Sequence, residues 1–229
     1  MPESMPRFMS TRRVIPRSRR GRLIAAATAT VVAVIGLSAH PATAGPGHGR
    51  IPGDHQSPVV SARALEALRA HDRFSTSGLP RDFVTYLAAR NTAADAVAAE
   101  LALDPAAVRN AWAGAGLQHQ EALLAALTQL GVPYKKNTSV PGDGFDCSGL
   151  TSFAWGRAGT DLVRQSSSQI TAASPRDTRT ATAGDLLQYP GHVMMYIGVG
   201  DAIVQAANPD NDVELSIVSR TVRYGDPAH

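Results

Sequence analysis

The sequence predicts an α+β fold in which a run of helices precedes an antiparallel sheet. From residue 58 to about residue 130, apolar residues recur at helical spacing in an alanine-rich background. After Gly159, short apolar segments alternate with glycine, proline and asparagine, which is typical of strands joined by tight turns. Helices that precede strands in this way favour the α+β class over alternating α/β architectures.

Residues 1–44 are expected to be a secretory signal peptide. Seven arginines precede an apolar run from Leu23 to Leu37, and Ala42-Thr43-Ala44 supplies the small residues of a cleavage site. The run is shorter than the ~20 residues that a membrane-spanning helix needs. We therefore expect export with cleavage after Ala44, rather than retention as an anchor, and no membrane attachment of the mature chain. Residues 45–57, rich in glycine and proline, are expected to form a flexible leader.

The basic charge of the chain comes from this first segment. Residues 1–44 hold seven of the 22 basic residues and one of the 19 acidic residues, which leaves 15 basic and 18 acidic residues. The net charge of +3 therefore becomes −3 once the segment is removed. A basic patch for nucleic acid is not expected, so the sequence predicts no nucleic-acid partner.

Residues 58–117, called here the helical prelude, are expected to form short helices. Leu65 and Leu68 would share one face of the first helix, and turn residues at 77–80 and 104–105 would separate the helices. The prelude holds no catalytic cluster. It is expected either to pack on the following domain or to bind a protein partner, and the sequence leaves both open.

Residues 118–229 are expected to form the catalytic domain. A helix at 118–130 and a loop at 137–144 lead to Cys147, which lies in the first turn of a further helix because Leu150, Phe153 and Ala154 follow at helical spacing. The chain from Gly159 onward is expected to be strand-like. Four strands are expected, at 184–189, 192–197, 202–207 and 213–218.

Cys147 is the candidate nucleophile. It is the single cysteine of the sequence, and exported proteins usually use cysteines in pairs, so the thiol is either chemically active or a small buried hydrophobic group. In the first turn of a helix, unpaired amide groups and the positive end of the helix dipole favour the thiolate. The thiolate is the nucleophilic form of cysteine.

His192 is the candidate base, because a nucleophilic cysteine needs a group that holds its proton and later returns it. His192 opens a predicted strand after a Pro190-Gly191 turn, whereas His71 and His119 lie among polar neighbours and are expected at the surface. The other histidines that follow the signal peptide lie in the leader or at the chain end: His48, His55 and His229.

Gln205 is the candidate third residue. If Ile197 pairs with Ala202 across the hairpin, Gln205 lies on the His192 side of the neighbouring strand and can accept a hydrogen bond that fixes the histidine tautomer. The alternative role for Gln205 is a polar residue that fills a gap. Asn208 is the alternative third residue.

Five blocks of the sequence resemble those of NlpC-type cell-wall cysteine endopeptidases in order and spacing. The blocks are Gly131-Val132-Pro133-Tyr134, Phe145-Asp146-Cys147-Ser148-Gly149-Leu150, residues 162–169, Gly184-Asp185-Leu186 and residues 192–198. The resemblance covers about residues 118–222. It implies a compact papain-like core that hydrolyses peptidoglycan stem peptides, commonly between D-γ-glutamate and the diamino acid.

The same resemblance implies roles for individual residues. Cys147 is then the nucleophile, His192 the base, and Gln205 the third polar residue, where the family more often has histidine. The residues that match positions around the substrate cleft are Tyr134, Asp146, Ser148, Arg164 and Ser166. From their residue types alone, Asp146 is also a helix cap and Arg164 equally a partner in a surface salt bridge.

The sequence thus predicts an exported cysteine endopeptidase, secreted or held at the cell wall. Two alternatives come from other classes: a non-catalytic wall-binding or scaffolding module, and an amidase or acyltransferase on a related thiol scaffold. No cofactor and no metal are expected, because the chain has one cysteine, no His-x3-His pair and no phosphate-binding or dinucleotide motif.

Overall fold

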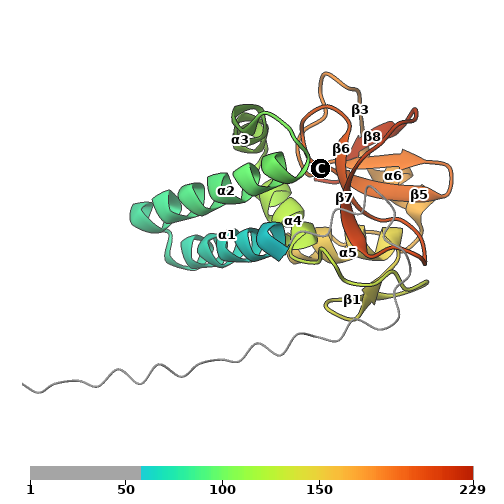
Figure 1. The fold of residues 1–229 in the computed structure, drawn as a ribbon, viewed down its shortest axis with the longest axis horizontal. Helices are drawn as coiled ribbons and strands as arrows, with labels where there is room; N and C mark the ends of the chain where they lie inside the picture. Colours follow the sequence, from blue (N-terminus) through green and yellow to red (C-terminus); the bar gives the residue numbers. More distant parts are fainter. Residues whose placement is uncertain (1–57, 229) are drawn as a thin grey trace, which may run out of the picture. The chain divides into compact units, whose positions relative to one another are not determined.

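The computed structural model describes residues 58–228, which lie within one compact unit, and the predicted signal peptide and leader fall outside these residues (Figure 1). Four helices come first: α1 (Pro58–Ser77), α2 (Pro80–Glu100), α3 (Pro105–Gly114) and α4 (Leu117–Leu127). A short hairpin and two helices follow: β1 (Ser139–Val140), β2 (Gly144–Phe145), α5 (Cys147–Arg157) and α6 (Ser166–Ala172). The remaining strands are β3 (Ser174–Arg176), β4 (Leu186–Tyr189), β5 (His192–Tyr196), β6 (Ala202–Ala206), β7 (Val213–Ile217) and β8 (Arg223–Asp226).

The helices of the prelude begin and end where the turn residues predict. Proline occupies the first position of α2 and α3, where its missing amide proton costs nothing, and the side chain of Asp104 accepts a hydrogen bond from the Ala106 amide to cap α3. α1 and α2 pack side by side (Figure 1). The buried face of α1 includes Leu68 but not Leu65, which is exposed because small residues such as Ala64 and Ala67 form the contact with neighbouring helices. Among residues 58–228, no helix has both the length and the apolarity to cross a bilayer.

The sheet has six antiparallel strands in the order β3-β8-β4-β5-β6-β7. The four predicted strands form its continuous half, from β4 to β7. The sequence analysis was wrong about two segments: residues 166–172 form the helix α6 rather than a strand, and residues 137–144, expected as a loop, contribute to the β1–β2 hairpin. It also missed β3 and β8, because β8 pairs between β3 and β4 at the far end of the chain and its partners are remote in sequence.

One hydrophobic core joins the prelude to the sheet. α5 packs against β5 and β6, and the core on this face includes Trp155, Met195 and Val204 together with Tyr86 and Trp112 of the prelude. The indole Nε1 of Trp112 donates a hydrogen bond of 2.9 Å to the carbonyl of Ile197, the residue that follows β5. The opposite face of the sheet has its own small cluster: Leu187, Met194, Tyr196, Ile203 and Val218.

His119 is a buried ion-pairing group, which corrects the prediction that it lies at the surface. Its Nε2 lies 3.2 Å from Oδ1 of Asp185 and 2.9 Å from Oδ1 of Asp226, and Arg176 binds the second oxygen of Asp226. Burial lowers the pKa of His119, but the hydrogen bonds to both carboxylates and their charges outweigh burial, so the pKa lies above its usual value. The polar neighbours in sequence gave no sign of this, because both carboxylates come from distant parts of the chain.

This cluster makes stability depend on pH in a defined direction. Because the pKa of His119 is raised on folding, its contribution is complete below its unfolded pKa of about 6.5 and is lost as the pH rises through the folded value. We expect His119→Gln to lower the free energy of unfolding by about 3 kcal/mol at pH 6, since it leaves two buried carboxylates without this partner. Urea unfolding between pH 6 and pH 9 measures both effects. The difference between the parent chain and the variant should shrink as the pH rises.

The matched control is Thr151→Val, which removes another buried hydrogen bond, that to Gln169, and changes no titratable group. It should keep the pH dependence of the parent chain. A difference between parent and His119→Gln that is constant from pH 6 to pH 9 would contradict the assignment.

Candidate active site

Cys147 is the first residue of α5, and its neighbour Asp146 caps that helix. Oδ1 of Asp146 accepts a hydrogen bond of 2.7 Å from the Gly149 amide, which fixes the start of the helix. The thiol is partly buried and lies at the end of the helix where the amide dipoles point outward. The sequence predicted both the position and the cap from local spacing.

Gly149 lets the chain cross closely over the first turn of α5. A Cβ at this position would lie 2.1 Å from the Thr138 carbonyl oxygen, so any larger residue would push residues 137–140 away from the helix. Ser139 Oγ donates a hydrogen bond of 2.9 Å to the Gly149 carbonyl in the same contact. The close approach at Gly149 is therefore made by the neighbouring backbone.

Asp146, Ser148 and Arg164 form one hydrogen-bonded group beside the thiol. Arg164 Nη1 donates to Ser148 Oγ at 2.7 Å, and Nη2 donates to Asp146 Oδ2 at 2.8 Å. The same Oδ2 accepts a bond of 2.7 Å from the Asn137 amide. Burial raises the pKa of Asp146, but the bonds from Arg164 and from the Gly149 and Asn137 amides outweigh it, so the pKa falls below its usual value. Both roles considered for these side chains, the helix cap and the salt bridge, are present.

Tyr134 lies close to this group, whereas Ser166 stands apart from it. Burial, and then the negative charges of Cys147 and Asp146, raise the pKa of Tyr134 above its usual value, so its phenol stays protonated at neutral pH. Ser166 is the first residue of α6 and is partly buried. In the described part of the chain its hydroxyl has no hydrogen bond to the other four predicted cleft residues.

His192 and Gln205 are joined by the strand register that the sequence predicted. The Ile197 amide donates to the Ala202 carbonyl, and Met195 pairs with Val204, which places Gln205 across from Met194. Nε2 of His192 lies 2.8 Å from Oε1 of Gln205. An amide oxygen is only an acceptor, so Nε2 carries the proton and Nδ1 is the basic nitrogen of the neutral ring. Asn208 caps its own turn by accepting from the Asp210 amide, and it is exposed.

Glu214 orients Gln205, and the sequence analysis missed it. Nε2 of Gln205 donates a hydrogen bond of 2.9 Å to Oε1 of Glu214, its direct partner across β6 and β7. Nδ2 of Asn211 lies 3.2 Å from Oε2 of the same carboxylate. Because the carboxylate only accepts, the amide of Gln205 must turn its NH2 toward Glu214 and its oxygen toward His192. The register of β6 and β7 was the signal that could have identified Glu214.

The backbone connects the two halves of the candidate site. The Tyr134 amide donates to the Asn211 carbonyl at 3.1 Å, and the Val213 amide donates to the Val132 carbonyl at 2.8 Å. The segment that carries Tyr134 is thus fixed beside the segment that supports Glu214. Within residues 58–228 no hydrogen bond joins Cys147 to His192, and the elements that carry the two residues, α5 and β5, contact each other.

Tyr189 and Arg220 surround His192. The Tyr189 ring packs against the imidazole with centroids 5.1 Å apart, and the guanidinium carbon of Arg220 lies 4.4 Å from the centre of the Tyr189 ring. Burial is the main cause that lowers the pKa of His192; the bond to Gln205 opposes it, and the charge of Arg220 lowers the pKa further. The imidazole is therefore neutral at neutral pH, as a general base must be.

Comparison with known proteins identifies the family. A sequence profile of the NlpC/P60 family matches residues 131–223. Peptidoglycan endopeptidase RipB of Mycobacterium tuberculosis is 31% identical over 185 residues, which cover 74% of this chain and 75% of that protein. The chain belongs to the NlpC/P60 family. This confirms the resemblance on which the sequence analysis relied, and the helix-on-sheet core confirms the predicted α+β fold.

Other NlpC/P60 relatives match a smaller part of their own length. The bifunctional muramidase/DL-endopeptidase CwlT of Bacillus subtilis is 36% identical over 90 residues, which cover 36% of this chain and 27% of that protein. The chain thus spans about a quarter of the first curated relatives that it matches. The solved structure of the peptidoglycan hydrolase RipB from M. tuberculosis aligns with a TM-score of 0.45 at 22% identity, covering 74% of this chain and 83% of that one.

The charge of Arg220 predicts how the pKa of His192 changes when Arg220 is replaced. Since the positive charge of Arg220 disfavours the imidazolium, Arg220→Gln should raise the pKa of His192. NMR titration of the imidazole resonances measures this directly. Arg223→Gln removes an exposed arginine nearby that makes no such contribution, and it should leave the pKa unchanged. A pKa that stays constant or falls in Arg220→Gln would show that Arg220 does not act on His192.

Proposed function

We propose that the chain is an exported cysteine-type peptidoglycan endopeptidase, with Cys147 as nucleophile, His192 as base and Gln205 as the residue that orients the base. The single observation that carries the proposal is the His192–Gln205 hydrogen bond of 2.8 Å, which leaves Nδ1 as the basic nitrogen. Family membership supports the substrate class, because relatives are named as endopeptidases and peptidoglycan endopeptidases. Peptide substrates in the cell wall also agree with the predicted signal peptide.

The proposed reaction has two steps. In the first, Nδ1 of His192 takes the thiol proton, Sγ of Cys147 attacks the peptide carbonyl, and the proton passes to the departing amine as the C–N bond breaks. In the second, His192 takes a proton from water, the hydroxide attacks the thioester, and the thiolate leaves. Negative charge on the carbonyl oxygen in both steps would be stabilised by the Cys147 amide, and by the phenol of Tyr134, which its raised pKa keeps protonated.

Substrate would bind on the side of the thiol where Tyr134, Asp146, Ser148 and Arg164 meet. Asp146 is already bound by Arg164 and two backbone amides, so we assign it first to holding this group in place and second to attracting a substrate amine. Ser166 completes the proposed binding set from the start of α6. The bond that we propose to be cleaved joins D-γ-glutamate to the diamino acid, as the family resemblance implies.

Replacing the nucleophile tests the mechanism. Cys147→Ala should abolish cleavage of a purified disaccharide-tetrapeptide while leaving the melting temperature close to that of the parent, because the thiol makes no hydrogen bond among the described side chains. Mass spectrometry of the products measures cleavage and also identifies the bond. Release of a whole stem peptide from the sugar would instead identify an amidase.

Alkylation separates an enzyme from a wall-binding module. In the parent chain, iodoacetamide should label Cys147 at neutral pH, and His192→Gln should slow this labelling, because His192 is the group that we propose takes the thiol proton. Asn208→Gln, which alters the other candidate third residue, should leave the labelling profile unchanged. Peptidoglycan binding without turnover, together with a labelling profile that is identical in His192→Gln, would favour the non-catalytic alternative.

Replacing Glu214, which accepts a hydrogen bond from Gln205, is expected to affect catalysis as well. Glu214→Gln keeps the size of the side chain but removes the acceptor-only group, so Gln205 can rotate and present its NH2 to His192. We expect kcat to fall about tenfold with KM little changed, which corresponds to the loss of one charged hydrogen bond of about 1.5 kcal/mol. Kinetics on a defined muropeptide measure the change. A roughly tenfold rise in KM with kcat unchanged would instead indicate that Glu214 acts in substrate binding.

A further inference from the structure

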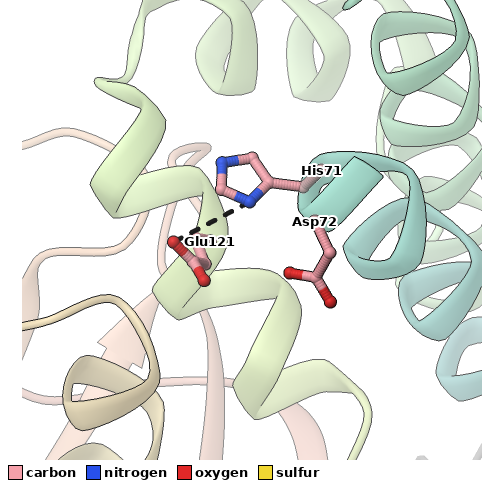
Figure 2. Close-up of side chains that lie close together, drawn as sticks. All are labelled: His71, Asp72 and Glu121. Atoms are coloured by element: carbon pink, nitrogen blue, oxygen red, sulfur yellow. Dashed lines mark ion pairs between the residues drawn. The ribbon is translucent and has the colours of Figure 1, made fainter. Parts of the chain in front are cut away.

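Three side chains of kinds that can bind metal ions lie close together where α1 contacts α4. His71 and Asp72 come from α1 and Glu121 comes from α4, and one nitrogen or oxygen atom from each lies within 4.8 Å of the others. Figure 2 shows the imidazole of His71 directed toward the Glu121 carboxylate, with the Asp72 carboxylate beside it. The cluster lies outside the candidate active site, since Cys147 begins α5 and Arg157, which binds this cluster, ends it about 15 Å away.

His71 has a buried nitrogen without a hydrogen-bond partner. The residue is 5% exposed, and Nδ1 is buried with no donor or acceptor in the described structure. The nearest opposite charge is Oε2 of Glu121, and at 3.8 Å it is too far for a hydrogen bond. Leaving a buried polar atom unpaired costs free energy, so such an atom requires an explanation. A cation between Nδ1 and Oε2 satisfies both atoms.

Arg157 forms hydrogen bonds with the carboxylates of both Glu121 and Asp72. Its Nη1 donates to Oε1 of Glu121 at 2.5 Å, and its Nη2 donates to Oδ1 of Asp72. The remaining oxygens, Oε2 of Glu121 and Oδ2 of Asp72, are the ones that a metal can use. Hydrogen bonds to the outer atoms of ligating carboxylates are a regular feature of metal sites. The two carboxylates and the guanidinium sum to −1, which still favours a divalent cation.

We propose that His71, Asp72 and Glu121 bind a divalent zinc-type ion that links α1 to α4. One imidazole nitrogen and two carboxylate oxygens suit zinc, whereas magnesium and calcium prefer oxygen ligands alone. Ligands about 2.0–2.2 Å from a zinc ion lie at most about 4.4 Å from each other. The observed 3.8 Å between Nδ1 and Oε2 fits this range, and all three ligand atoms lie within 4.8 Å of one another, so binding needs only small side-chain movements.

The role that follows is structural. The ion would join the prelude to α4, and through Arg157 to the last turn of α5, so it would stabilise the prelude against the domain that carries Cys147. Because α5 lies between this site and the thiol, the proposal makes no use of the metal in peptide hydrolysis. It therefore stands or falls independently of the proposed enzymatic activity.

Zinc titration by calorimetry tests the site, and it must be separated from zinc bound by the thiol and imidazole of the active site. The test therefore uses the untagged full chain carrying Cys147→Ala. We expect one zinc ion per chain, a rise in melting temperature that EDTA reverses, and no comparable effect of magnesium. His71→Gln on this background should weaken zinc binding by more than the ~10–100-fold that loss of an outer hydrogen-bond partner costs.

The matched control is Asp95→Asn, which removes a carboxylate from another ion pair of the prelude, that with Arg109. It should bind zinc as the background chain does. If His71→Gln is poorly folded, Glu121→Gln provides the same test, and zinc-edge anomalous diffraction from crystals of the Cys147→Ala chain locates the ion directly. Zinc binding that is unchanged by His71→Gln and Glu121→Gln, or an anomalous map with no peak between His71 and Glu121, would overturn the proposal.

Discussion

The pairing of β5 with β6 is the constraint on which the candidate site depends. A strand presents alternate residues to opposite faces, so a shift of one residue would move Gln205 to the other face and remove the partner of His192. The observed register, with Met195 opposite Val204, is stabilised by apolar residues buried on both faces: Met194 and Ile203 on one, Met195 and Val204 on the other. The tautomer of a single histidine thus depends on the packing of a whole hairpin.

On the cysteine side, Asp146 constrains the backbone through both of its carboxylate oxygens. Asp146 accepts a hydrogen bond from the third residue of the helix with one oxygen, while its other oxygen binds Arg164 and the Asn137 amide. A capping residue with one bond would fix only the helix start, whereas Asp146 also fixes the backbone at Asn137. The lowered pKa of Asp146 means that these contacts persist until the solution is strongly acidic. Cys147 therefore lies in a backbone frame that is insensitive to pH near neutrality.

Local patterns in the sequence predicted much of this, and their limits have a physical cause. The helix that begins at Cys147, its cap and the His192–Gln205 contact each depend on spacing within about fifteen residues, which periodicity describes. β8, the carboxylates around His119 and the partner set of His71 depend instead on segments far apart in the chain. Glu214 lies between these cases, since it is nine residues from Gln205 but becomes visible only once the β6–β7 register is known.

The Gln205 amide is neutral, but the Glu214 carboxylate polarises it. An amide stabilises an imidazolium less than a carboxylate would, but Glu214 lies directly behind the amide and polarises it through a hydrogen bond of 2.9 Å. The carboxylate of Glu214 is thus connected to His192 by two hydrogen bonds, with the Gln205 side chain between them. Burial is the main cause that lowers the pKa of His192, and the positive charge of Arg220 adds to it, so the pKa lies below its usual value although the hydrogen bond to Gln205 opposes both. The balance keeps the imidazole unprotonated at neutral pH, and Glu214 would stabilise the positive charge that forms if His192 takes the proton of the thiol, as we propose.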